Sequence, residues 1–213
     1  MVGPVLELRS VLNSSNRWKV LVGCTALFFA LYGIPNRFSL GTPSTLPLTE
    51  FDQATPFWLE SVWIYFSAYG MIFVTFFRLR ELRTLNRLLY SFLMLTALSS
   101  AVFVLFPTVY PRGLFPLPED AAWTTLAFSW LRAVDLPTNC APSLHVGISV
   151  LSTLPFFTES QRKTGTFFLL WTLAIWISTV TTKQHYWIDG LLGGGLAAGI
   201  YRFFGSRFVR YLD

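Results

Sequence analysis

Apolar residues gather in six long runs along this chain, and short polar or proline-rich stretches separate the runs. Each run holds about 16 to 22 residues with few charges, close to the length at which a helix crosses a bilayer. The pattern therefore predicts an all-α bundle of six transmembrane helices that forms one domain over residues 1–213. The predicted spans are residues 18–34, 57–77, 88–109, 142–157, 166–182 and 188–204.

Turn-forming and polar residues set the expected boundaries. Pro35-Asn36 should stop the first helix, and residues 36–56 carry too many prolines and glycines for a helix. Pro142 suits the first turn of the fourth helix, where no amide is needed. Residues 119–134 have apolar positions at helical spacing, which predicts a helix lying on the membrane interface. The apolar positions of residues 6–12 are compatible with a short surface helix.

Composition agrees with a polytopic membrane protein. Hydrophobic residues make up 53% of the chain and charged residues 13%, with a mean hydropathy of +0.52. A soluble domain carries about twice that charged fraction, and a core of this size cannot hide so much apolar surface. The formal charge of +5 is spread between apolar runs rather than over one face. We therefore expect membrane lipids as partners, and no nucleic acid.

The distribution of basic residues predicts an orientation. With six spans, twelve of the 16 Lys and Arg lie on one side, which the positive-inside rule makes cytoplasmic, together with both termini. Arg37, Arg112, Arg132 and Lys183 are left on the other side. Because the rule disfavours cations there, Arg112 and Lys183 call for an anionic substrate group. Contact with lipid headgroups is the alternative for Arg112.

The two histidines of the chain lie in two short polar runs at the ends of apolar runs, residues 139–145 and 183–189. His185 and Asp189 are four residues apart, so a helix places them on one face, where the carboxylate can orient the imidazole as a nucleophile or base. Ser143 and His145 lie where the amides and the dipole of a helix N-terminus favour phosphate. The predicted topology puts both runs on the non-cytoplasmic face. Taken alone, each run also fits a helix end with an interfacial histidine.

These two runs resemble motifs of the type-2 phosphatidic acid phosphatase superfamily. Pro142-Ser143-Leu144-His145 is similar to its second motif, Pro-Ser-Gly-His. His185-Tyr186-Trp187-Ile188-Asp189 is similar to the end of its third motif, Ser-Arg-x5-His-x3-Asp. The resemblance covers the last four predicted spans, and the family's six-helix frame fits the whole chain. It implies a membrane enzyme that needs no metal and no organic cofactor.

The resemblance also implies residue roles. His185 would form a phosphohistidine, Asp189 would orient it, and His145 would protonate the leaving alcohol. Ser143 would help to hold the phosphate. The expected activity is hydrolysis of a lipid phosphate monoester or diphosphate on the non-cytoplasmic side.

The chain departs from the family pattern at several positions. Leu144 replaces the glycine of the second motif, Thr179 replaces the arginine of the third, and the first motif, Lys-x6-Arg-Pro, is absent. Lys183 and Arg112 are the expected substitutes for phosphate binding, with Arg87 a weaker candidate. These changes resemble the branch of inositol phosphorylceramide and sphingomyelin synthases, so transfer of a phospho-headgroup to a lipid alcohol is the alternative to hydrolysis.

Two further alternatives stay open. His145, His185 and Asp189 are a ligand set that suits a catalytic zinc, although the nearby cations oppose this. A membrane carrier without catalysis is the other, although the chain has neither the internal duplication nor the midspan polar site common in transporters. The sequence leaves the lipid, the acceptor and the oligomeric state undetermined.

Overall fold

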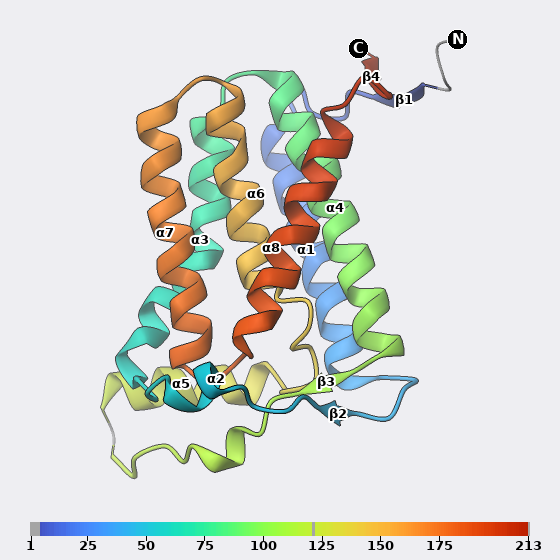
Figure 1. The fold of residues 1–213 in the computed structure, drawn as a ribbon. Coiled ribbons are helices and arrows are strands. Elements are labelled where there is room, and N and C mark those ends of the chain that lie inside the picture. Colours follow the sequence, from blue (N-terminus) through green and yellow to red (C-terminus); the bar gives the residue numbers. More distant parts are fainter. Residues whose placement is uncertain (1–4, 121, 213) are drawn as a thin grey trace.

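The computed structural model describes residues 5–120 and 122–212, and within them the fold is mostly helical. Six helices lie side by side as an antiparallel bundle (Figure 1). They are α1 (Arg17–Arg37), α3 (Val62–Arg78), α4 (Leu82–Leu105), α6 (Leu144–Thr158), α7 (Arg162–Thr181) and α8 (Trp187–Phe204).

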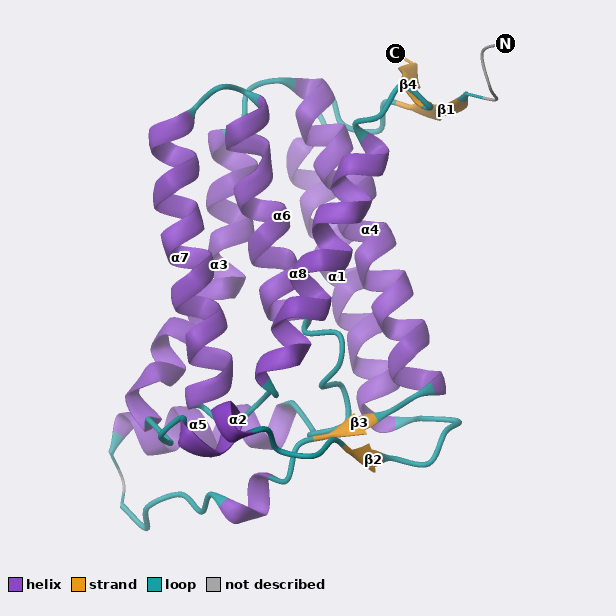
Figure 2. Ribbon diagram, in the orientation of Figure 1, coloured by secondary structure: helices purple, strands orange, loops and turns teal. Residues whose placement is uncertain are grey.

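The two ends of the bundle differ (Figure 2). At one end strands β1 (Leu6–Arg9) and β4 (Val209–Leu212) pair in parallel, so both described ends of the chain lie there. The opposite end, which we call the loop end, carries the remaining short elements. These are α2 (Glu50–Ala54), α5 (Trp123–Val134), the 3-10 turns Leu59–Ser61 and Arg112–Leu114, and the paired strands β2 (Ser44–Thr45) and β3 (Thr108–Val109).

Four helical segments are long and apolar enough to cross a membrane: Arg17–Arg37, Leu59–Arg78, Leu82–Leu105 and Arg162–Thr181. This confirms a mostly helical fold with four candidate membrane spans, which coincide with four of the six predicted ones; six membrane crossings stay a prediction. Helix α6 has 15 residues and is shorter than these four. It packs against α3, α4, α7 and α8, so its neighbours rather than lipid cover most of its surface.

The expectation that Pro35-Asn36 stops the first helix is wrong. Helix α1 continues to Arg37 with Pro35 inside it. A proline within a helix lacks the amide that the carbonyl four residues earlier would accept, here that of Leu31. The hydroxyl of Ser100 on α4 lies 2.8 Å from the Leu31 carbonyl oxygen and 2.7 Å from that of Thr96. Because the helix already supplies Thr96 with an amide donor, the hydroxyl proton can replace the donor that Leu31 lacks.

Other boundaries move because charged residues join the helices. Helix α4 begins at Leu82, six residues before the expected start, and α7 begins at Arg162 rather than at residue 166. Within α4, the Arg87 guanidinium donates to the Tyr201 carbonyl and lies 3.7 Å from the centre of that ring. These contacts stabilise the Arg87 guanidinium near the start of α4, so the helix can begin before its apolar run.

Three local expectations are also corrected. Residues 50–54 form α2 inside the expected loop, because Thr49 and Asp52 make a capping box. Residues 6–9 form β1 instead of a surface helix, because they pair with β4. Pro142 precedes α6, and Ser143 is the N-cap, with its hydroxyl accepting from the Val146 amide at 3.5 Å.

The predicted helix of residues 119–134 is present as α5, which starts at Trp123; residue 121 lies outside the described residues. It runs across the loop end of the bundle (Figure 1). Trp123, Leu126 and Trp130 expose apolar side chains on one side, while Phe128 and Leu131 are buried. Its place on a membrane interface stays a prediction.

The role of Ser100 at the proline of α1 can be measured. We expect Ser100→Ala to lower the free energy of unfolding by about 1–2 kcal/mol, because it leaves the Leu31 carbonyl without a donor. Ser91→Ala is the control, since the Ser91 hydroxyl bonds the Arg87 carbonyl, which the helix already satisfies. Thermal unfolding of both variants in detergent gives the comparison, and equal shifts would contradict the assignment.

Candidate active site

The N-terminal ends of α6 and α8 meet at the loop end of the bundle. The Ser143 amide donates to the Asp189 carbonyl at 3.0 Å. Gly193 makes this approach possible, because a Cβ on it would lie 2.1 Å from the Ser143 carbonyl oxygen. The contact brings both histidine runs together, with the ring centres of His145 and His185 5.8 Å apart.

The imidazole of His185 is held through one nitrogen. Its Nδ1 lies 2.8 Å from the Cys140 carbonyl oxygen and 3.4 Å from Asp189 Oδ2. Both partners are acceptors, so Nδ1 carries the proton and Nε2 of the neutral ring presents a lone pair. The expected pairing with Asp189 is present, but the backbone carbonyl is the closer partner. In this tautomer Nε2 of His185 is unprotonated, as a nucleophilic nitrogen must be.

His145 has a different environment, made of hydroxyl groups. Its Nδ1 lies 3.2 Å from the Tyr65 hydroxyl and its Nε2 lies 3.1 Å from the Tyr69 hydroxyl. The Tyr65 ring also lies against the imidazole, with the ring centres 4.1 Å apart. Each hydroxyl can donate or accept, so which nitrogen of His145 carries the proton depends on the groups beyond the two tyrosines.

Asp189 does two jobs at the start of α8. Its Oδ2 accepts from the Tyr186 amide at 2.9 Å and so caps the helix, while it also faces His185. Its Oδ1 is buried and has no hydrogen-bond partner among the described residues. The cap fixes the carboxylate rigidly beside the imidazole.

Arg112 lies in a buried polar cluster with Asp135. Its guanidinium donates to the Asp135 carbonyl, and Nη2 lies 3.7 Å from the Asp135 carboxylate. Its Nε is buried without a hydrogen-bond partner among the described residues. Asp135 in turn lies 3.4 Å from the hydroxyl of Tyr65, which contacts His145. The cluster therefore links Arg112 to the histidines, and phosphate binding by Arg112 stays a prediction.

Lys183 is buried and points at α2. Its ammonium donates to the carbonyls of Asp52 at 2.8 Å and Thr55 at 2.6 Å, so two of its three donors are used. Burial lowers the pKa of this ammonium, and Asp52 opposes the shift. In this arrangement Lys183 links α2 to the α7–α8 loop. Phosphate binding by Lys183 stays a prediction that would draw on its third donor.

Thr179 stands where the third motif has arginine. It is buried and supports the backbone of the loop that follows α7. The Thr179 carbonyl accepts from the amides of Gln184 and His185, and the Thr179 hydroxyl bonds its own helix at Trp176. Thr179 thus brings no charge to the site. It shapes the turn that presents His185.

A possible metal cluster overlaps the site. Ligand atoms of Cys140, His185 and Asp189 lie within 4.8 Å of one another. This differs from the zinc set considered from the sequence, since Cys140 takes the place of His145. Burial raises the pKa of the Cys140 thiol, which disfavours the thiolate that metals bind. The geometry therefore fits a hydrogen-bonded histidine better than a metal ligand.

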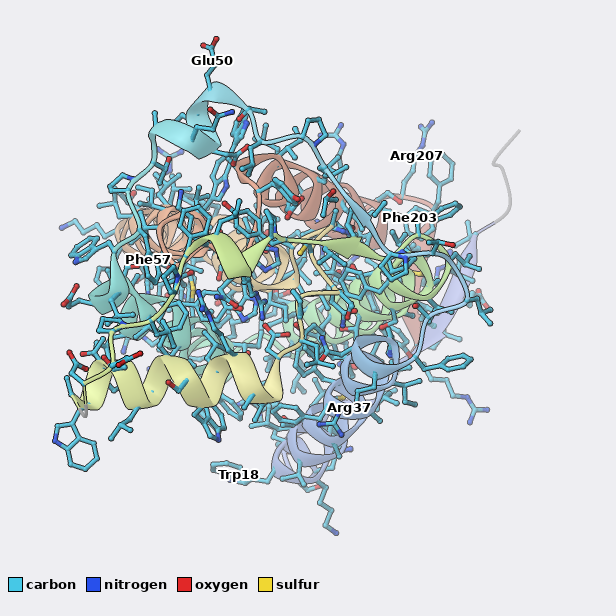
Figure 3. The ribbon with its side chains drawn as sticks, turned by 90° about the horizontal axis from the view of Figure 1, so that it is seen from below. Trp18, Arg37, Glu50, Phe57, Phe203 and Arg207 are labelled. Atoms are coloured by element: carbon cyan, nitrogen blue, oxygen red, sulfur yellow. The ribbon has the colours of Figure 1, made fainter. Side chains whose placement is uncertain are left out.

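An apolar groove reaches the site from the side of α1. One cavity of about 890 Å³ lies between α1, α3 and α5, and a second of about 220 Å³ continues to His145. They share Phe28, Phe29, Tyr32 and Tyr69, and we call the pair the α1–α3 groove. Figure 3, which looks onto the loop end, shows α1 with Arg37 at the edge of the bundle beside α5.

Sequence analysis missed four residues of the site: Tyr65, Tyr69, Asp135 and Asp52. A signal existed for the tyrosines, which are four residues apart in an apolar run and so share one helix face. Asp135 and Asp52 are 5% and 1% exposed, and only the tertiary structure identifies them as buried acids. Asp52 caps the N-terminal end of α8, where its Oδ1 accepts from the Trp187 amide at 2.9 Å.

The close approach at Gly193 gives a test of the site's geometry. We expect Gly193→Ala to push α6 away from α8 and to reduce activity at least about a hundredfold, because catalytic groups tolerate little displacement. Gly195→Ala on the same helix is the matched control, since a Cβ there meets nothing within 4 Å. The assay is phosphate release from a lipid phosphate; similar activity in both variants would contradict the assigned contact.

Comparison with known proteins gives one finding. No curated protein and no solved structure matches this chain. A family model described as PAP2 superfamily matches residues 52–203. The match spans α2 to α8 and includes both histidine runs, Asp135 and the α5 helix. The match covers well over half of the chain, and the chain belongs to the PAP2 superfamily, a membership that fits a phosphatase or phosphotransferase.

Proposed function

We propose that this protein is a membrane phosphatase that hydrolyses a lipid phosphate monoester or diphosphate through a phosphohistidine on His185. The observation that carries the proposal is the pairing of two differently held imidazoles. Nδ1 of His185 faces two acceptors, which leaves Nε2 for attack on phosphorus. His145 stands 5.8 Å away between two hydroxyls, at the distance where it can serve a leaving group on the same phosphorus.

In the first step, Nε2 of His185 attacks phosphorus and an N–P bond forms as the bond from phosphorus to the leaving oxygen breaks. His145 gives the proton on its Nε2 to that oxygen, and the alcohol leaves. In the second step, water attacks phosphorus and passes a proton to Nε2 of His145 as the N–P bond breaks. Inorganic phosphate and the free His185 result.

The phosphate needs donors, which the loop end can supply. Ser143 is the N-cap of α6, and the first amides and the dipole of that helix favour an anion. Arg112 has a buried Nε–H without a partner among the described residues. The Lys183 ammonium has a third donor besides those that bond Asp52 and Thr55, and it lies 4.9 Å from the centre of the Phe115 ring. We assign these three residues to phosphate binding. This set would take over the role of the arginine of the third motif, whose position Thr179 occupies in this chain.

The α1–α3 groove supports a lipid as the substrate. In an in-line displacement the nucleophile and the leaving oxygen lie on opposite sides of phosphorus. In a lipid phosphate monoester the leaving oxygen is attached to the apolar chain, so the chain must lie on the side of the acid. The groove reaches His145, and His185 is not among its lining residues. We therefore place the apolar chain in this groove.

The same arrangement supports six membrane crossings. Six antiparallel helices put both described chain ends at one end of the bundle, together with basic residues at the C-terminal end of α3 and the N-terminal ends of α4 and α7. The positive-inside rule would make that end cytoplasmic. The loop end and the catalytic histidines would then face the periplasm, the lumen or the outside.

Transfer to a lipid alcohol is the second candidate. A further apolar cavity of about 690 Å³ lies at the loop end between α2, α7 and Trp187. It is separate from the α1–α3 groove, with no lining residue in common. Such a cavity offers a place for an acceptor lipid. Transfer differs from hydrolysis only in that an alcohol replaces water in the second step.

The decisive experiment measures phosphate release by the purified protein from a panel of lipid phosphates. We expect His185→Ala to lose at least about a thousandfold in rate, because the covalent step disappears. Asp120→Asn, an exposed acid outside the site, is the control. Vanadate should inhibit, and a radiolabelled phosphate should be trapped on the wild type in an acid-labile form.

Each alternative has its own outcome in that experiment. Full activity of His185→Ala would overturn the phosphohistidine mechanism. Loss of activity with EDTA and recovery with zinc would favour a metal hydrolase. Phosphoryl transfer only after addition of an alcohol lipid would favour the transferase, and tight binding without turnover would favour a carrier.

The groove gives an independent prediction about chain recognition. We expect Gly33→Phe to narrow the α1–α3 groove and to raise KM for a long-chain lipid phosphate about tenfold, with little effect on a short-chain phosphate. Gly23→Phe on the same helix is the control, because Gly23 does not line the groove. KM measured for both chain lengths checks this, and an equal effect on both substrates would contradict it.

A further inference from the structure

A chain of hydrogen-bonding groups runs from a buried carboxylate to His145. Asp135 follows α5 and is 5% exposed. Its Oδ2 lies 3.4 Å from the Tyr65 hydroxyl, and that hydroxyl lies 3.2 Å from His145 Nδ1. On the far side of the ring, Tyr69 lies 3.1 Å from Nε2. Four groups on three segments therefore form one line through the imidazole.

The donors and acceptors in this line have only one consistent arrangement when the carboxylate is ionised. A carboxylate accepts and cannot donate, so the single hydroxyl proton of Tyr65 points at Asp135. The Tyr65 oxygen can then only accept from His145, so Nδ1 carries a proton. In the neutral ring, Nε2 is left as the acceptor for the Tyr69 hydroxyl.

Asp135 is itself held firmly from several sides. Its Oδ1 accepts from the Tyr32 hydroxyl and from Asn36 Nδ2, both on α1. Its Oδ2 also faces the Arg112 guanidinium, which balances its charge. The carboxylate is therefore fixed by donors of α1 and of the loop before α5, as well as by Tyr65. A carboxylate buried in an apolar bundle is a candidate for a functional role, whereas an acid on the surface is not.

We propose that Asp135 is a positioning residue for His145 and that it acts on the imidazole through the Tyr65 hydroxyl. By holding the Tyr65 hydroxyl as a donor, it fixes the tautomer in which Nδ1 of His145 carries the proton, so that Nε2, the nitrogen beside Tyr69, is the one that gains and gives a proton. When the ring is protonated, the same chain stabilises the imidazolium, and Nε2–H is ready for the leaving oxygen. The proposal rests on the proposed function of His145 as the acid.

Placing the acid at this end of the groove agrees with the chemistry. Tyr69 and His145 both line the inner cavity of the groove. The Tyr69 hydroxyl thus marks a polar position beside Nε2, where the oxygen at the head of an apolar chain can lie. Because the leaving oxygen of a lipid phosphate is joined to that chain, the oriented nitrogen meets the atom that needs a proton.

The test uses two variants. Asp135→Asn replaces one carboxylate oxygen with an amide nitrogen, and Tyr65→Phe removes the hydroxyl oxygen. With an alkyl lipid phosphate we expect kcat to fall about tenfold to a hundredfold, with KM changed less than about threefold. The double variant should be no slower than the worse single variant, because both residues act through one chain. Tyr90→Phe and Asp120→Asn are the matched controls; Tyr90 bonds the Arg9 carbonyl at the opposite end of the bundle.

The pH profile separates this role from simple loss of structure. The groups around His145 are Tyr65 and Tyr69 on α3 and His185 before α8, with Asp135 and Arg112 beyond Tyr65. The acid must be protonated, so kcat/KM falls at high pH as His145 loses its proton. Removing the negative charge or the Tyr65 acceptor destabilises the imidazolium, so this limb should move to lower pH in both variants.

A substrate with a good leaving group gives the sharpest separation. A nitrophenyl phosphate releases an anion that needs no proton, so its first-turnover burst should be nearly unchanged in Asp135→Asn and Tyr65→Phe. His185→Ala should lose the burst with both substrates. Equal losses with alkyl and aryl substrates, additive losses in the double variant or an unmoved pH limb would overturn the role of Asp135. Activity in His185→Ala would instead overturn the proposed function itself.

Discussion

The contact between the first turns of α6 and α8 is the constraint on which the site depends. Both histidines lie at helix N-termini that are far apart in the sequence, and a backbone hydrogen bond from Ser143 to Asp189 joins them. Gly193 permits that bond because any side chain there would meet the Ser143 carbonyl. The distance between the two imidazoles therefore follows from backbone packing rather than from flexible side chains.

The surroundings of the two rings explain why they are suited to different tasks. In an apolar bundle each polar group needs a partner, and the partner decides which nitrogen carries the proton. His185 faces a carbonyl and a carboxylate, which fix one tautomer. His145 faces two hydroxyls, which can donate or accept, and so its state depends on groups farther away. The first arrangement suits a nucleophile and the second a proton carrier.

The cations at the loop end take on structural work as well. Lys183 donates to carbonyls of the α2 segment, and Arg112 pairs with Asp135. Arg112 Nε has no hydrogen-bond partner among the described residues, and the Lys183 ammonium has a third donor besides the two that bond carbonyls, so a structural contact and a proposed contact with phosphate are compatible. Because an unpaired buried charge is energetically costly in a membrane protein, each of these cations needs the partners that its structural contacts provide.

The sequence by itself determined the fold class, most of the helical runs and the two histidine runs that the structure brings together. Length, hydropathy and the His-x3-Asp spacing are local properties that need no neighbours to be recognised. It missed the continuation of α1 past Pro35, because the donor that replaces the lost amide is Ser100 on another helix. It also missed Asp135, Tyr65 and Asp52, whose importance lies in burial and in partners 70 or more residues away. Only the tertiary structure decides such long-range pairings, because the cost of burying a polar group depends on what surrounds it.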